Sequence, residues 1–188
     1  MSASTASLAP GIWIVDPVHS DVSFRVRHMG VGRVHGTFTL ASAELTIADD
    51  GAAASSVTAV VDSASVYTGN EQRDQHIRSA DFLDVENYPS IEFASTQVRD
   101  VDGDRFIVVG DLAIHGVTRT VELAAECLGT VEDPSGGERV GFTATTTISR
   151  AAFGVDIHLG FGAGNVVVAD TIEITIDVEF TNERADQS

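Results

Sequence analysis

The sequence has one cysteine, few basic residues and no long apolar run, and each shortage excludes a class of protein. The lone thiol, Cys127, cannot form an internal disulfide, so the chain does not demand an oxidising compartment. No window approaches the roughly 20 apolar residues that a membrane-spanning helix needs. Residues 1–10 lack both a positive segment and an apolar core, so no secretory signal is visible and we expect a cytoplasmic location.

Acidic residues strongly outnumber basic ones. The chain has 28 Asp plus Glu against 11 Lys plus Arg, which gives a formal net charge of -17. Such a surface repels nucleic acid phosphates and anionic lipid headgroups. We therefore expect no nucleic-acid partner and no stable membrane insertion, and we interpret the acidity as a source of solubility.

The 188 residues suit one domain, and apolar and polar residues alternate along it as in half-buried strands. Residues that favour turns, such as Asp49-Asp50-Gly51 and Asp102-Gly103-Asp104, separate these runs. The expected strands are 12–15, 22–28, 34–40, 43–48, 57–62, 91–98, 105–114, 118–129, 139–149 and 170–181. No helix–strand alternation occurs, so the sequence predicts an all-β antiparallel sandwich or up-and-down barrel of about eight to ten strands.

Residues 68–83 break this pattern, because they are polar and almost free of β-branched side chains. Asn70 is placed to cap a short helix of about two or three turns, around 70–80, crossing one end of the barrel. We expect a flexible N-terminal tail over 1–11, a single barrel domain over 12–181 and a flexible C-terminal tail over 182–188.

The histidines are the first candidates for chemistry, but none sits in a compact metal motif. His28 and His35 could face each other across a hairpin, with His19 and Asp16 near them. Metal binding needs at least three converging ligands, so we predict no metal site. No Gly-x-Ser-x-Gly elbow occurs and Cys127 falls on an apolar strand face, so no catalytic residue is predicted either.

A glycine-rich stretch covers residues 154–165. It does not match a nucleotide-binding fingerprint that opens a helix, so we predict no cofactor. A loop at the barrel mouth, with Phe161 as the tip of a lid, is the better interpretation.

Several long motifs resemble the YceI-like family. They are Trp13-x-x-Asp16-x-x-His19-Ser20, Phe24-x-Val26-Arg27-His28-Met29-Gly30, Asn70-x-x-Arg73-Asp74-x-His76-x-Arg78-Ser79-x-Asp81-Phe82, Tyr88-Pro89, Phe93-x-Ser95, Gly110-x-Leu112-x-Ile114-x-Gly116-Val117-Thr118-Arg119 and Ile148-x-Arg150-x-x-Phe153-Gly154. The resemblance runs from about Trp13 to Phe180 in the expected order.

The resemblance implies a lipocalin-like antiparallel barrel of about eight strands that holds an isoprenoid or quinone-like lipid in its interior, without catalysis. The residues expected to contact the apolar tail are Phe24, Phe38, Phe82, Phe93, Phe106, Phe142 and Phe161. Candidates for contacts with the head group, or for gating the mouth, are His19, His28, Arg73, His76, His115 and Arg119. As a structural alternative, Arg73 and Arg119 would pair with Asp62, Asp74 or Asp81.

Two other functions fit the same pattern. One is a small barrel enzyme acting on such lipids with His19, His28, His76 or His115 as acid/base groups. The other is an interaction module whose barrel is filled by its own side chains. An exposed edge near the N-terminal strand could also support a homodimer.

Overall fold

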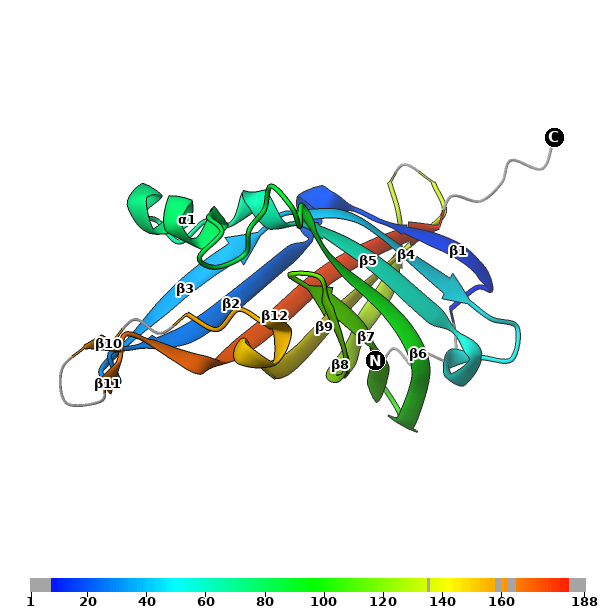
Figure 1. Ribbon diagram of the computed structural model, residues 1–188. Helices are drawn as coiled ribbons and strands as arrows, with labels where there is room; N and C mark the ends of the chain where they lie inside the picture. The colour runs from blue at the N-terminus through cyan, green and yellow to red at the C-terminus, as the bar shows by residue number, and fades with distance from the viewer. Residues whose placement is uncertain (1–7, 135, 158–159, 162–164, 183–188) are drawn as a thin grey trace.

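The computed structural model describes residues 8–134, 136–157, 160–161 and 165–182, and strands dominate it (Figure 1). The described residues contain one α-helix, α1 (Glu71–Arg78). The strands are β1 (Gly11–Val15), β2 (Asp21–His28), β3 (Gly32–Phe38), β4 (Leu40–Ile47), β5 (Ser56–Asp62), β6 (Ser90–Asp102), β7 (Arg105–Ile114), β8 (Val117–Glu132), β9 (Glu138–Ser149), β10 (Gly160–Phe161), β11 (Asn165–Val166) and β12 (Val168–Asn182).

The long strands form a closed antiparallel barrel of eight strands, as the resemblance predicts, and this decides between the sandwich and the barrel that the alternation left open. Two of the eight are bent in the middle. β1 and β2 are halves of one strand, separated by a 3₁₀ turn at Pro17–His19, and only Thr39 separates β3 from β4. The order around the barrel is then β3/β4, β5, β6, β7, β8, β9, β12 and β1/β2, while β10 and β11 form a separate small hairpin.

The N-terminal strand closes the barrel. Ile14 of β1 pairs with Glu44 of β4 on one side and with Thr181 of β12 on the other. The expectation of an exposed edge at this strand is therefore wrong, because both of its edges are hydrogen-bonded. Packing also begins within the predicted N-terminal tail, since Leu8 is buried and the indole N–H of Trp13 donates to the carbonyl of Ala9.

Two strand glycines make room for aromatic rings that point into the barrel. A Cβ on Gly36 would lie 2.4 Å from the ring of Phe24, and a Cβ on Gly110 would lie 2.4 Å from the ring of Phe93. Each glycine faces a ring from an adjacent strand, so the absence of a side chain lets the ring lie directly on the backbone.

Helix α1 begins where the sequence predicts. The side chain of Asn70 accepts a hydrogen bond from the backbone N–H of Arg73 at 3.0 Å, which satisfies a donor left unpaired by the first turn. The carboxylate of Asp74 is buried and accepts from both the backbone and the hydroxyl of Thr68. These contacts hold the helix over one end of the barrel, beside β3 (Figure 1). Among the described residues no helix is long and apolar enough to span a bilayer.

Candidate functional site

The barrel encloses a cavity of about 340 Å³. It reaches from Leu8 and Ser55, near the turn between β4 and β5, to Phe82 and Phe153 at the α1 end. Every one of the eight barrel strands contributes wall residues, because alternate side chains of each strand point inward. Apolar atoms make up almost the whole wall, so the cavity can accept hydrocarbon but offers little to a charge.

Six of the phenylalanines expected to contact an apolar tail lie on this wall. They are Phe24, Phe38, Phe82, Phe93, Phe106 and Phe142. Phe24 packs against Phe38 with ring centroids 5.4 Å apart, and Phe106 packs against Phe142 at 6.1 Å, so these four rings also form part of the core. Phe161 falls in β10, but its side chain lies outside the described part of the chain. Contact between these rings and a ligand stays a prediction.

The head-group candidates do not form one cluster, and none of them lines the cavity. Four of them lie around the α1 end, and two of these, His76 and His115, pack against aromatic rings there. His76 packs edge-on against Phe82, with ring centroids 5.0 Å apart, and His115 packs against Tyr88 at 4.7 Å. Arg73 belongs to α1 and Arg119 follows the β7–β8 turn.

The remaining two candidates are His28 and His19. His28 is the last residue of β2, opposite Gly32, and His35 pairs with Arg25, so the expected His28–His35 contact across the hairpin is wrong. His19 lies in the 3₁₀ turn outside the barrel, where its side chain is 60% exposed.

The expected ion pairs of Arg73 and Arg119 are also wrong. The Arg73 guanidinium donates to the hydroxyl and the carbonyl of Thr68, at 2.7 and 2.9 Å. That of Arg119 donates to the carbonyl of Ala152 at 3.1 Å. Backbone and hydroxyl acceptors lie closer to these arginines than carboxylates do, and the sequence pattern does not reveal such partners.

Arg150 is a wall residue that was not among the predicted site residues. Its guanidinium donates to four backbone carbonyls, those of Val155, Ile157, Val168 and Ala169, at 2.7–3.3 Å. The side chain therefore joins the segment after β9 to the start of β12. Because the wall is almost wholly apolar, Arg150 contributes its aliphatic stem to the cavity and turns its charge away. Its place in the motif Ile148-x-Arg150 was the available signal.

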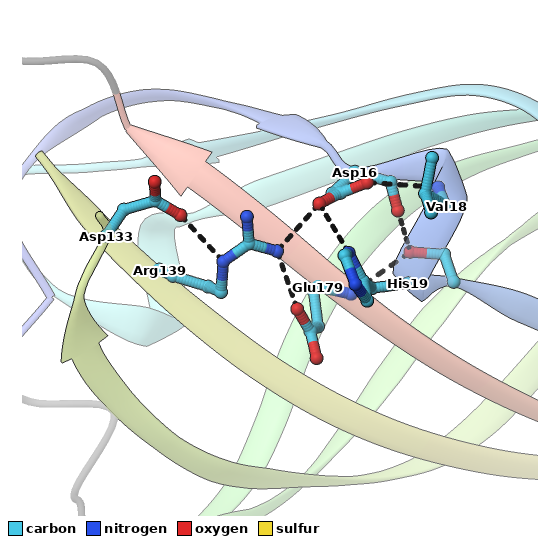
Figure 2. A network of polar contacts seen from close by, with 7 residues as sticks. Asp16, Val18, His19, Asp133, Arg139 and Glu179 are labelled. Atoms are coloured by element: carbon cyan, nitrogen blue, oxygen red, sulfur yellow. Dashed lines mark hydrogen bonds and ion pairs between the residues drawn. The ribbon is translucent and has the colours of Figure 1, made fainter. Parts of the chain in front are cut away.

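A second polar feature lies on the outer wall, centred on Arg139 at the start of β9 (Figure 2). Its guanidinium donates to Asp16 at 2.8 Å, to Asp133 at 2.7 Å and to Glu179 at 2.6 Å. His19 lies 2.8 Å from the same carboxylate of Asp16. We call these five residues the Arg139 network. It connects the β1–β2 junction, the β8–β9 turn and β12 where the barrel closes.

The electrostatics of the Arg139 network are those of a structural site. The hydrogen bonds from His19 and Arg139 hold the pKa of Asp16 well below its usual range, and the three carboxylates raise the pKa of Arg139. The donor atoms of Asp16, His19 and Glu179 lie within 4.8 Å of one another, a spacing that a metal ion could use. Both carboxylates, however, already accept from the same nitrogen of Arg139, so the guanidinium supplies the positive charge between them.

Solved structures of low sequence identity share this fold. Burkholderia cenocepacia BcnA superposes with a TM-score of 0.74 at 23% identity, over 88% of this chain and 98% of that protein. A polyisoprenoid binding domain from Saccharophagus degradans gives a TM-score of 0.63 at 16% identity, over 90% of this chain and 97% of that domain. At these identities the likeness concerns the fold alone.

Sequence similarity is more specific. Protein YceI of Escherichia coli O157:H7 is 37% identical over 155 residues, which are 82% of this chain and 81% of that protein. A UPF0312 protein of Vibrio vulnificus is 38% identical over 139 residues, 74% of each chain. The profile of the YceI-like domain matches residues 13–180, nearly the whole barrel. The chain therefore belongs to the YceI-like family.

Proposed function

We propose that this protein binds the apolar chain of an isoprenoid or similar amphiphilic lipid inside its barrel and carries it without chemical change. The observation that supports this most directly is the cavity, because a wall of apolar atoms suits hydrocarbon. Each methylene transferred from water into it gains about 0.8 kcal/mol. The Saccharophagus degradans neighbour, described as a polyisoprenoid binding domain, supports the choice of lipid class.

The wall also bears on where the head group would lie. Since the wall is apolar, the polar end of such a lipid would stay at a barrel mouth. The α1 end is the better candidate, because His76 and His115 lie behind its apolar closure and Arg73 lies on the helix above. His19, on the outer wall, is poorly placed for this role.

Non-catalytic binding is favoured over the two alternatives. None of the four proposed acid/base histidines, His19, His28, His76 and His115, belongs to the cavity wall. General acid/base catalysis needs a group within hydrogen-bonding reach of the reacting atom, directly or through one water. A barrel filled by its own side chains would leave no cavity of this size.

Native mass spectrometry of freshly purified protein, followed by organic extraction, tests the proposal. We expect about one unchanged isoprenoid or similar lipid per barrel, or uptake of a prenol or quinone by the empty protein. An empty protein that fails to take up either compound would contradict it. So would pH-dependent turnover of the lipid that is lost in His28→Ala.

A matched pair of variants connects binding to the cavity. Ala144 lies on the cavity wall of β9, while its neighbour Thr145 is exposed on the outer face. Ala144→Phe should displace at least two ligand methylenes and weaken prenol binding by about 15-fold or more, whereas Thr145→Phe should leave it unchanged. Thermal unfolding of the empty proteins reports whether both variants fold. Equal affinities in two folded variants would show that the ligand binds elsewhere.

A further inference from the structure

Positive charge is concentrated on one hairpin of this acidic protein. Between Asp21 and Glu44, the longest stretch of the chain without a carboxylate, the sequence carries three arginines and two histidines. This stretch contains strands β2 and β3 and the turn that joins them. The remaining eight arginines share the chain with all 28 acidic residues. The net charge of -17 therefore conceals one cationic element.

The charges of this hairpin point outward. Arg25 and Arg27 are exposed and alternate with Phe24 and Val26, which line the cavity on the inner side of the same strand. On β3, Arg33 and His35 are likewise exposed. The hairpin thus presents cations to solvent and apolar side chains to the cavity.

The pairing of these residues is unfavourable for the isolated protein. Arg27 lies directly opposite Arg33 in the register of β2 and β3, and like charges in that position destabilise a sheet. Within the described residues neither arginine has a carboxylate partner. Arg25 has only a long contact, at 3.8 Å, with the exposed Glu173 of β12. An anionic partner would relieve this repulsion.

The turn between the strands adds an apolar tip. Val31 is 94% exposed, the most exposed of the large hydrophobic residues in the described part of the chain. The turn is held in place, because Met29 and Gly30 adopt positive φ angles and the N–H of Met29 donates to the carbonyl of Val167. In the sequence around Val167, no carboxylate lies between Asp156 and Asp170. An exposed valine flanked by arginines suits a lipid bilayer, whose interface takes an apolar side chain while its phosphates accept from guanidinium groups.

We propose that the β2–β3 hairpin docks the protein on the surface of an anionic lipid bilayer. At physiological ionic strength, charges more than about 8 Å away are largely screened, so acidic residues beyond that distance contribute little to the potential at the hairpin. Glu173, 3.8 Å from Arg25, lies within that distance and offsets part of the charge of one arginine. Val26 and Val168 line the cavity near the C-terminal end of β2. Docking would therefore bring this part of the cavity wall close to the bilayer. This interaction goes beyond lipid binding in the cavity, and it can be tested without any ligand.

Flotation with vesicles of phosphatidylcholine, alone or mixed in equal parts with phosphatidylglycerol, tests the docking. The wild type should bind the mixed vesicles preferentially and lose binding as salt rises. In the double variant Arg27→Gln with Arg33→Gln, the partition coefficient between water and the mixed vesicles should be about 25-fold lower than in the wild type. This corresponds to about 2 kcal/mol, or about 1 kcal/mol per arginine. The same double variant should keep or gain stability in urea, because the like-charge pair is gone.

The control is Arg99→Gln with Arg105→Gln, which changes the net charge equally. These arginines lie near the β6–β7 turn and pair with Glu122 and Glu126. This variant should bind vesicles like the wild type. Val31→Asn should weaken binding by up to about tenfold if the tip enters the interface.

Equal vesicle binding by the hairpin variant and the control would overturn the proposal, as would equal binding to neutral and anionic vesicles. A hairpin-dependent interaction with a nucleic acid or an acidic protein that Val31→Asn leaves intact would also overturn it. Failure of the docking proposal can be distinguished from failure of the proposed lipid binding in the cavity. Ala144→Phe should still float with anionic vesicles, and the hairpin variant should still take up a prenol offered from detergent.

Discussion

Replacing Arg139 tests how much the Arg139 network, which lies where the barrel closes, contributes to the free energy of unfolding. Arg139→Met keeps the apolar stem but removes three hydrogen bonds to Asp16, Asp133 and Glu179. An exposed ion pair contributes at most about 1 kcal/mol, whereas removing one partner of a buried pair costs about 3–5 kcal/mol. The Arg139 side chain is 22% exposed and that of Asp133 only 3%, but Glu179 is 37% exposed and its contact is more strongly screened. We therefore expect a loss of about 3 kcal/mol in the free energy of unfolding at neutral pH.

Urea unfolding measures this loss, and Arg105→Met is the control. The Arg105 side chain is 75% exposed with Glu126 as its ion-pair partner, so its replacement should cost less than about 1 kcal/mol. The pH dependence gives a second check. Asp16 has a lowered pKa in the folded protein, so its contribution is complete above its ordinary pKa of about 3.9 and is lost as pH falls through the lowered value. The gap between wild type and Arg139→Met should be full above about pH 5 and narrow below about pH 4. A cost equal to that of the control, or a gap unaffected by acid, would refute this account.

Two further changes test the core. Gly110→Ala should destabilise the protein by about 1–3 kcal/mol in urea, because the new methyl group would meet the Phe93 ring and the Ala94 carbonyl, whereas Gly32→Ala, with its nearest neighbour at 3.8 Å, should change stability by less than about 0.5 kcal/mol. Similar costs for the two alanines would contradict the tight ring contact. Burial raises the pKa of the Cys127 thiol, so a thiol-reactive disulfide reagent at mildly alkaline pH should label the native protein at least about tenfold more slowly than the urea-unfolded one. Equally fast labelling in both states would show that β8 opens readily.

Local patterns in the sequence predicted the elements of this fold well. The alternation over 170–181 matches β12, and Asn70 caps α1 as expected. The bending of two long strands was not visible, because each half alternates correctly by itself. For that reason β1 was expected at an edge, although the bend lets it pair on both sides.

The sequence predicted which apolar residues line the cavity better than it predicted which polar residues contact one another. Inward phenylalanines follow from alternation, and six of them lie on the cavity wall. The polar contacts depend on approaches between distant segments. Arg139 meets a carboxylate 123 positions away in Asp16 and another 40 positions away in Glu179, and no local spacing signals either contact. Arg73 meets Thr68 only because the turn before α1 folds back on the helix.

The pairing of β1 with β12 has a consequence for the order of folding. These strands stand at opposite ends of the domain, so the ring of hydrogen bonds cannot be completed until the whole domain has left the ribosome. Before that point β9 lacks its β12 partner, and the inner face of the unfinished sheet, rich in valine and phenylalanine, is open to water. The contacts that complete the barrel join residues far apart in sequence, which makes closure a slow step. The nascent chain is thus most prone to aggregation just before its last strand pairs.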